Sequence, residues 1–256
     1  MAARAADGAR GPVALMTGGS GGLGAAICAA LASAGFRIAV GYHRAQDAAL
    51  RLAAALPGAG HFAVAAPVTD SAALRAVAGE IERRCGRCDV LVNGAGTTRF
   101  VPHNDLDRLE DALFDAIFAV NVRGAFAAVR ALQHLLERST LAGGGVVINI
   151  SSIAAVTAIG SNVAYCASKA ALDNMTRSLA RALAPRVRVL SVSPGLVDTD
   201  FVKSLDQSWR DEQAARTALR RLASPEEVAK AVVAAVTQLT FSTGAIIAVD
   251  GGRPLN

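Results

Sequence analysis

Short apolar runs alternate with longer amphipathic segments from residue 13 to the end of the chain. The apolar runs are rich in Val and Ile and carry few polar positions, which is typical of strands that are covered on both faces. The runs that predict strands are Val13–Thr17, Phe36–Tyr42, Phe62–Ala65, Asp89–Val92, Val146–Ser151, Val187–Ser193 and Ala245–Val249.

Helical periodicity occupies the segments between these runs. The predicted helices are Leu23–Ala34, Asp47–Leu56, Ser71–Cys85, Leu109–Arg138, Val163–Ala184 and Pro225–Leu239. We expect Ser71 to cap one of them and Ser224 another, because a proline and two acidic residues follow Ser224. Regular alternation of strand and helix predicts an α/β fold: one doubly wound, parallel, seven-stranded sheet with helices on both faces and right-handed connections.

The composition excludes several classes of protein. A chain of 256 residues that is 52% hydrophobic can bury a large core and is not intrinsically disordered. Gly, Ser, Asn or charged residues interrupt every apolar run before the ~20 residues that a membrane span requires, so we expect no membrane partner. Residues 1–12 lack periodicity and predict a flexible N-terminal extension before a single domain at 13–256. The interpretation is a soluble, cytoplasmic protein.

The charge and the potential metal ligands give no evidence for a nucleic-acid partner or a metal site. The net charge of +5 is spread over separated arginines and only 4% of residues are aromatic, so we expect no nucleic-acid partner. Cys85 and Cys88 have CxxC spacing, but no second pair of ligands lies at a spacing suited to zinc. The histidines form no ligand cluster, and no metal site is predicted.

A glycine-rich turn links the first predicted strand to the first predicted helix. Its sequence, Thr17-Gly18-Gly19-Ser20-Gly21-Gly22-Leu23-Gly24, has the spacing TGxxxGxG. Glycines let the backbone approach a phosphate, and the following helix N-terminus offers free N–H groups and partial positive charge. No Gly-Lys-Ser/Thr follows, which argues against a mononucleotide P-loop and favours a dinucleotide.

A second group of residues has the chemistry of proton transfer. Tyr165 and Lys169 are four residues apart in a predicted helix and share one face, so the ammonium is expected to favour phenolate and lower the pKa of Tyr165. Ser152 follows an apolar strand, where doubly wound folds place their ligands. Asn121 lies inside a long helical pattern, where an amide is otherwise poorly favoured.

These residues, in this order, resemble the short-chain dehydrogenase/reductase family from Val13 to the Asp250-Gly251-Gly252 tail. The resemblance implies a Rossmann fold and a catalytic set in which Tyr165 is the general acid or base. Lys169 would then lower the pKa of that tyrosine and bind the nicotinamide ribose. Ser152 would bind the reacting oxygen, and Asn121 would hold a water that carries protons onward.

The resemblance also implies a cofactor site. The implied contacts are Gly18, Ser20, Gly21, Gly22, Leu23, Gly24, Tyr42, His43, Arg44, Val68, Asn93, Ala95, Gly96, Tyr165, Lys169, Pro194, Gly195, Val197 and Thr199. Members that prefer NAD usually carry an acid after the second strand, whereas this chain has Arg44, whose guanidinium suits a 2′-phosphate. We therefore expect NADP, with NAD less favoured; a purely solvated Arg44 is the alternative.

Two positions depart from the family pattern. Gly94 replaces the second asparagine of the usual Asn-Asn-Ala-Gly, and Pro67 replaces an aspartate that reaches the adenine. Neither residue takes part in proton transfer. We therefore expect altered cofactor affinity rather than lost chemistry.

The substrate is set mainly by a lid at about 198–222, whose Phe201, Leu205 and Trp209 suggest an apolar cover. Gly96-Thr97-Thr98-Arg99 and Arg186 are similar to positions in 3-oxoacyl-acyl-carrier-protein reductases. The leading hypothesis is an NADP(H)-dependent reductase of a 3-oxoacyl-type carbonyl, with an acyl carrier as a candidate partner. The alternatives are an alcohol, sugar or polyol dehydrogenase and a non-catalytic dinucleotide-binding regulator. The family further implies a homotetramer.

Overall fold

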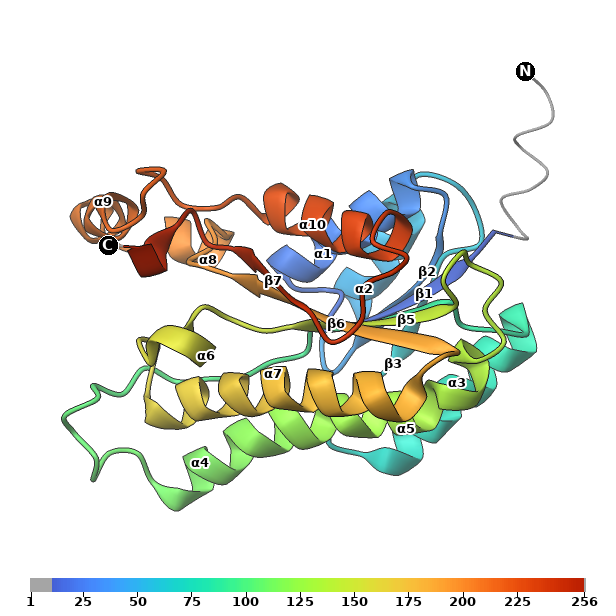
Figure 1. The fold of residues 1–256 in the computed structure, drawn as a ribbon, viewed down its shortest axis with the longest axis horizontal. Helices are drawn as coiled ribbons and strands as arrows, with labels where there is room; N and C mark the ends of the chain where they lie inside the picture. The colour runs from blue at the N-terminus through green and yellow to red at the C-terminus, as the bar shows by residue number, and fades with distance from the viewer. Residues whose placement is uncertain (1–10, 256) are drawn as a thin grey trace.

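One seven-stranded sheet runs through the centre of the protein, and all of its neighbouring strands are parallel. The computed structural model describes residues 11–255, so most of the predicted N-terminal extension lies outside the described residues. The strand order is β3-β2-β1-β4-β5-β6-β7 (Figure 1). The strands are β1 Val13–Thr17, β2 Arg37–Tyr42, β3 Phe62–Ala65, β4 Val90–Asn93, β5 Gly145–Ile150, β6 Val187–Pro194 and β7 Ile246–Val249.

Helices cover both faces of this sheet (Figure 1). One layer contains α1 Gly22–Ser33, α2 Gln46–Ala55 and α10 Pro225–Thr237. The other contains α3 Ser71–Cys85, α4 Asp111–Phe118, the π-helical η1 Ala119–Gly124, α5 Ala125–Leu136 and α7 Val163–Leu183. The short α6 Ala154–Thr157, α8 Asp200–Lys203, α9 Gln207–Ala215 and η2 Arg253–Leu255 complete the described chain. The predicted doubly wound fold is confirmed.

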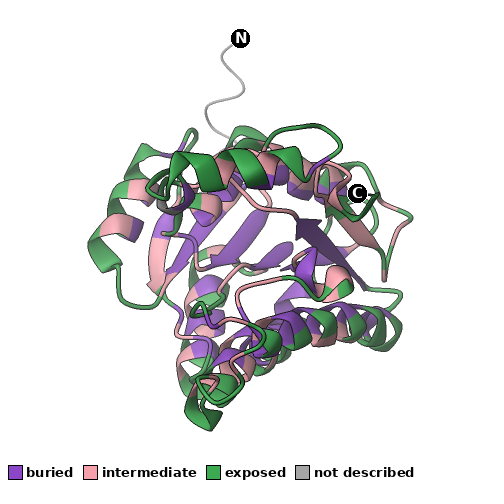
Figure 2. Ribbon diagram, turned by 90° about the vertical axis from the view of Figure 1, so that its left-hand side faces the viewer, coloured by how far each residue is buried: buried purple, intermediate pink, exposed green. Residues whose placement is uncertain are grey.

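Alternation along each strand divides the interior into two hydrophobic cores. On β1, Ala14 and Met16 face the core under α1 and α10, whereas Val13 and Leu15 face the core under α3 and α5. Because both faces are covered, the inner strands β1, β2, β4, β5 and β6 are buried over most of their length, whereas the edge strands β3 and β7 are mostly half-buried (Figure 2). This explains why the strands read as continuous apolar runs rather than as alternating ones.

The predicted ends of the helices and strands agree with the structure to within two residues. Two other details differ. The predicted helix Leu109–Arg138 is interrupted by η1, a feature that hydrophobic periodicity does not reveal. Asp70, not Ser71, caps α3, since its Oδ1 accepts hydrogen bonds from Ala72 N at 2.8 Å and Ala73 N at 3.0 Å. The predicted Ser224 cap is confirmed as a capping box with Glu227.

The continuous helical stretch Asp111–Leu136 is long and apolar enough to cross a membrane by length and composition. From the sequence we expected polar residues to break every apolar run before it reached the length of a membrane span. By length and mean composition, this segment reaches that length despite its polar residues. Its α5 part packs against α3 and the sheet, with Leu132, Leu135 and Leu136 fully buried. It is a core helix of this fold.

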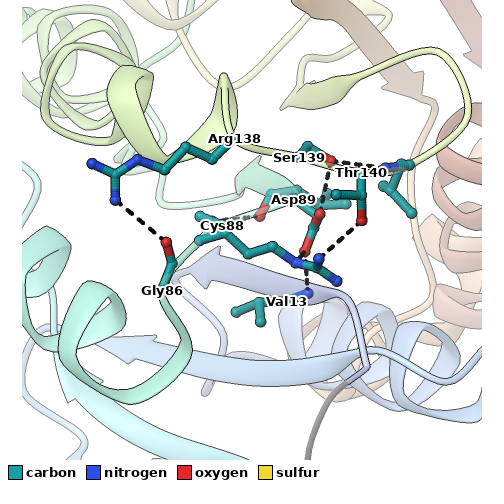
Figure 3. Close-up of polar contacts among 10 residues, drawn as sticks. Val13, Gly86, Cys88, Asp89, Arg138, Ser139 and Thr140 are labelled. Atoms are coloured by element: carbon teal, nitrogen blue, oxygen red, sulfur yellow. Dashed lines mark hydrogen bonds and ion pairs between the residues drawn. The ribbon is translucent and has the colours of Figure 1, made fainter.

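Asp89 fastens the amino ends of the central strands (Figure 3). Its buried carboxylate accepts hydrogen bonds from Val13 N at 2.8 Å, Ser139 Oγ at 2.7 Å and Arg87 Nε at 3.0 Å. Arg87 in turn donates to Thr140 Oγ1 at 2.9 Å. These contacts join β1, the residue before β4 and the segment after α5.

Arg188 on β6 has an equally buried role that the sequence did not indicate. Its guanidinium donates to Leu239 O at 2.9 Å, Val236 O at 3.1 Å and Ala235 O at 3.2 Å, at the end of α10. A cation there satisfies terminal carbonyls and complements the negative end of the helix dipole. Arg188 thus anchors α10 to the sheet.

Met16 fills the space that the departure at Gly94 leaves open. A Cβ atom added at Gly94 would collide with Met16 Cε and lie 3.0 Å from Thr17 O. Met16 is 1% exposed and packed in the core, so it cannot swing into solvent. The glycine and the methionine therefore act as a matched pair at the ends of β1 and β4.

We expect Gly94→Asn to lower the free energy of unfolding by about 1–3 kcal/mol, because the new side chain overpacks a filled core. Met16→Ala alone should also destabilise the protein, because it leaves a cavity. The double variant should lose less stability than the sum of the two single variants. Urea unfolding of all four proteins measures this coupling, and strictly additive losses would contradict it.

Candidate active site

The predicted catalytic residues meet at the carboxyl ends of β4 and β5 and the start of α7. This edge contains the loop after β4, the loop after β5 and the segment with α8 and α9, which lie on the same side of the molecule (Figure 1). Ligands of doubly wound folds bind at this edge, near the point where the strand order changes direction. Here that point lies between β1 and β4.

Lys169 and Tyr165 lie together on the first turns of α7. Lys169 Nζ is 5.7 Å from the centroid of the Tyr165 ring and donates a hydrogen bond to Ile150 O, the last residue of β5, at 2.8 Å. Lys169 is buried, whereas Tyr165 is half-buried. The i,i+4 spacing thus places an ammonium beside the phenol, as predicted.

Ser152 follows β5 and forms a hydrogen bond with Tyr165 that lowers the pKa of the phenol. Burial has the larger effect, and the pKa of Tyr165 is raised above its ordinary value. This differs from the sequence expectation of a lowered pKa. The physical reason is that the apolar environment of the ring disfavours phenolate more than the nearby hydroxyl favours it.

Asn121 lies in η1 and is buried. Its Oδ1 accepts from Thr97 N at 2.8 Å, and its Nδ2 donates to Thr97 O at 3.1 Å and to Ser168 Oγ at 3.1 Å. The amide therefore pairs with both backbone groups of one loop residue. A Cβ added at Gly96 would lie 3.6 Å from Asn121 Oδ1 and 3.9 Å from Lys169 Nζ, so the β4 loop passes directly over the catalytic groups.

Asn162 is a residue that the sequence analysis missed. Its Oδ1 caps α7 by accepting from Tyr165 N at 2.7 Å, while its Nδ2 donates to Arg99 O at 2.7 Å and Thr98 Oγ1 at 3.2 Å. The side chain fixes the start of the helix that carries Tyr165 and ties it to the β4 loop. An asparagine just before a predicted helix was an available signal.

The side chain of Asn93 belongs to a buried network. It donates to Asn149 Oδ1 at 2.9 Å, Asn149 donates to Thr176 Oγ1 at 2.8 Å, and Thr176 bonds the Ser191 hydroxyl at 2.9 Å. The network joins β4, β5, α7 and β6. The Oδ1 atom of Asn93 is buried without a hydrogen-bond partner among the described residues, and a cofactor contact at position 93 stays a prediction.

The glycine-rich turn fits a dinucleotide phosphate. Gly18 has φ of +71°, and a Cβ added at Gly24 would collide with Gly18 O, so both positions require glycine. Helix α1 begins after Gly21 with no side-chain cap and no acidic residue in its first turn. Its N–H groups and dipole therefore remain available to an anion. Ser20, Gly22 and Leu23 lie in the same turn or first helical residues.

Thr17 holds this turn against the β4 loop. Its Oγ1 accepts from Gly94 N at 3.1 Å and Ala95 N at 3.3 Å. Ala95 and Gly96 therefore lie between the glycine-rich turn and the catalytic groups. A cofactor that reaches from the glycine-rich turn to Tyr165 would have to pass these two residues, as the predicted cofactor contacts require.

The remaining predicted cofactor positions lie along the same edge of the sheet. Tyr42 ends β2, and His43 and Arg44 follow it with exposed side chains. No acidic residue occupies this turn, and Arg44 makes no side-chain hydrogen bond or ion pair within residues 11–255. Buried Val68 packs against Gly124 of η1, where an added Cβ would lie 2.8 Å from its Cγ2.

The segment after β6 turns back towards α1. Pro194 ends β6, and Gly195 N donates to Val249 O at 3.0 Å. Val197 pairs with Ala223 in an isolated bridge, and a Cβ added at Gly22 would lie 3.8 Å from Thr199 Cβ. The predicted contacts Gly22 and Thr199 are thus brought together.

The predicted lid contains α8 and α9, and polar contacts hold it internally and attach it to the rest of the chain. Arg210 Nη2 pairs with Asp198 Oδ1 at 2.9 Å, and Arg253 Nη2 donates to Gln213 Oε1 at 2.7 Å. The second contact attaches α9 to the C-terminal η2. Trp209 remains partly exposed on this segment.

The comparisons with known proteins agree with this architecture. Residues 18–253 match the family described as enoyl-(acyl carrier protein) reductase. The chain is 38% identical over 253 residues to a granaticin polyketide synthase protein of Streptomyces violaceoruber assigned as ketoacyl reductase 2, covering 98% of this chain and 99% of that protein. It is also 38% identical over 248 residues to D-threitol dehydrogenase of Mycolicibacterium smegmatis, covering 94% and 92% of the two chains.

A solved structure shares the fold over nearly the full length. It is a crystal structure of a Burkholderia xenovorans protein assigned as a short-chain dehydrogenase/reductase, with a TM-score of 0.88 and 33% identity, and the match covers 96% of this chain and 99% of that one. Sequence, sheet order and the site at the carboxyl edge of the sheet therefore lead to one conclusion. The chain belongs to the short-chain dehydrogenase/reductase family, whose members are oxidoreductases acting on CH–OH groups.

Proposed function

We propose that the protein is an NADP(H)-dependent carbonyl reductase that acts on a 3-oxoacyl-type substrate in the cytoplasm. The observation that carries the proposal is the convergence of Ser152, Tyr165 and Lys169, with the ammonium 5.7 Å from the phenol ring. A phenol donor with a hydroxyl partner and a neighbouring cation has the groups that proton transfer to a carbonyl oxygen requires.

Each side chain has a distinct part in this reaction. A nicotinamide cofactor, when bound, supplies the hydride that reduces the carbonyl carbon. Tyr165 donates its hydroxyl proton to the substrate oxygen, and Ser152 donates a hydrogen bond to the same oxygen as negative charge develops there. Lys169 stabilises the phenolate that remains. Asn121 keeps the β4 loop in place over Lys169 through its two bonds to Thr97.

The environment of Tyr165 keeps its phenol in the acid form. Because burial raises the pKa of Tyr165, the phenol is protonated at neutral pH. A protonated phenol is ready to act as the general acid of reduction. Oxidation of an alcohol would first require its proton to leave.

The choice of substrate draws on the relatives. One relative that matches nearly the whole chain is assigned as a ketoacyl reductase, which supports a 3-oxoacyl thioester. The other is a D-threitol dehydrogenase, so oxidation of a polyol is the alternative. A non-catalytic dinucleotide-binding regulator is opposed by the complete set of proton-transfer groups.

Arg186 does not support docking of an acyl carrier at the site of its own protomer. It follows the end of the 21-residue helix α7, whereas Tyr165 lies at the start. A helix of that length spans about 30 Å. We therefore propose the acyl thioester itself as the substrate class, whether or not an acyl carrier protein is attached to it.

We expect Tyr165→Phe to reduce kcat for 3-oxoacyl thioester reduction by about 10²–10⁴-fold, because it removes the proton donor. NADPH affinity, measured by nicotinamide fluorescence, should remain close to that of the wild type. Thr237→Val, which removes a distant hydroxyl on α10, serves as the control and should leave both quantities unchanged. Full turnover by the Tyr165 variant would refute the mechanism, and wild-type activity on polyols alone would favour the alternative.

We expect Arg44→Ala to weaken NADPH binding by roughly 10–100-fold, because a charged hydrogen bond to the 2′-phosphate contributes about 1.5–3 kcal/mol. NADH affinity should not change. Arg51→Ala, which removes another exposed arginine of the same region, is the matched control. Tighter binding of NADH than NADPH by the wild type would overturn the cofactor assignment.

We further propose a homotetramer assembled through α4, α5 and α7. Exposed apolar side chains lie on these helices, and Phe118, Val122, Phe126 and Met175 line a hollow in this surface. We expect light scattering to give about four times the chain mass of 26.1 kDa, and we expect Phe126→Asp to lower that mass. A wild-type monomer at working concentration would contradict the assembly.

A further inference from the structure

Asp173 lies one helical turn after Lys169 on α7 and is almost completely buried. The exposed fraction is 5% for Asp173 and 6% for Lys169. Asp173 Oδ1 has no hydrogen-bond partner among the described residues. A buried carboxylate without a partner is costly unless a nearby positive charge offsets it.

The residues around Asp173 leave Lys169 as that charge. The charged residues of α4 and η1, which pack against α7, are Asp111, Asp115 and Arg123, and all are exposed. On α7 itself, Arg177 is exposed and forms no ion pair with Asp173 in the part of the chain that the structure describes.

The strands that pack against α7 carry no other charged side chain near Lys169 and Asp173 among the described residues. β5 ends at uncharged Ile150, and β6 passes through uncharged Ser191 and Ser193. Arg188, the charged residue of β6, lies at the opposite end and donates to carbonyl groups at the end of α10. The short helix α6, which also packs against α7, carries no charged residue.

The ammonium of Lys169 needs a negative charge nearby to stay protonated. Burial lowers the pKa of Lys169, the charge of Asp173 offsets part of this effect, and the resulting pKa is about 8. The hydrogen bond to Ile150 O uses one of the three ammonium donors, and a neutral lysine could make that same bond. A neutral lysine could not, however, stabilise a phenolate on Tyr165.

We propose that Asp173 is a positioning residue that keeps Lys169 protonated, acting through its buried negative charge one helical turn away rather than through a direct ion pair. The functional consequence rests on the proposed function, in which charged Lys169 stabilises the Tyr165 phenolate. The charge link itself does not depend on any substrate.

The small number of lysines makes a direct test possible. The lysines of the chain are Lys169, Lys203 and Lys230, so ¹³Cε-lysine labelling of the full-length protein gives a spectrum in which Lys169→Met assigns the signal of interest. We expect Asp173→Asn to lower the titration midpoint of Lys169 by about one pH unit or more, because the raising charge is lost. Asp173→Glu should keep the midpoint close to that of the wild type.

Glu80→Gln is the matched control, because it removes one negative charge from a partly exposed side chain on α3, which packs against α5. It should leave the Lys169 midpoint unchanged. An unchanged midpoint in folded Asp173→Asn overturns the proposal. Activity gives a separate result. If the Lys169 midpoint falls in Asp173→Asn but reductase activity is lost at the same alkaline pH as in the wild type, the charge link is supported. The proposed role of Lys169 in the reaction is then refuted.

A second measurement applies if Asp173→Asn does not fold. Lys169→Met leaves Asp173 buried without its compensating charge, so it should be destabilised. Adding Asp173→Asn to Lys169→Met should then raise the free energy of unfolding above that of Lys169→Met alone. A double variant that is equally stable or less stable would refute the link.

Discussion

Buried polar side chains tie the central strands to one another and to their helices, and the position of every candidate catalytic group depends on them. Asp89 fastens the amino ends of β1 and β4 with three hydrogen bonds. Asn93, Asn149 and Thr176 link the carboxyl halves of β4 and β5 to α7. Hydrophobic burial gives these layers their stability but is not directional, whereas buried polar groups accept few geometries. These hydrogen bonds therefore fix the position of α7 along the strands of the sheet.

The same principle extends to the loops over the site. Asn121 and Asn162 hold the β4 loop from two sides, one from η1 and one from the start of α7. Each amide uses both its donor and its acceptor, so movement of the loop would leave buried polar atoms unsatisfied. As a result, the groups around Tyr165 are set before any ligand arrives, which is what efficient electrostatic stabilisation requires.

Burial shifts the pKa values of the two ionisable candidate catalytic groups in opposite directions. It raises the pKa of Tyr165 and lowers the pKa of Lys169 to about 8, so it favours the neutral form of both. The phenol is thereby kept as an acid, but the ammonium is brought close to losing its charge near physiological pH. A buried carboxylate one turn away is a simple way to maintain that charge without occupying the ammonium's donors.

The sequence by itself determined the fold class and the parallel arrangement of the strands, and it gave the candidate residues for proton transfer. Apolar runs covered on both faces, the glycine spacing and the i,i+4 pair of Tyr165 and Lys169 are local patterns, and local geometry follows from them. The tertiary structure decided the features that depend on contacts between segments far apart in the chain. The π-helical turn at Asn121, the Asn162 bridge, the packing of Met16 against Gly94 and the raised pKa of Tyr165 are of this kind. Each arises because burial and hydrogen-bond satisfaction are set by neighbours that lie far away in the chain, and no local pattern records them.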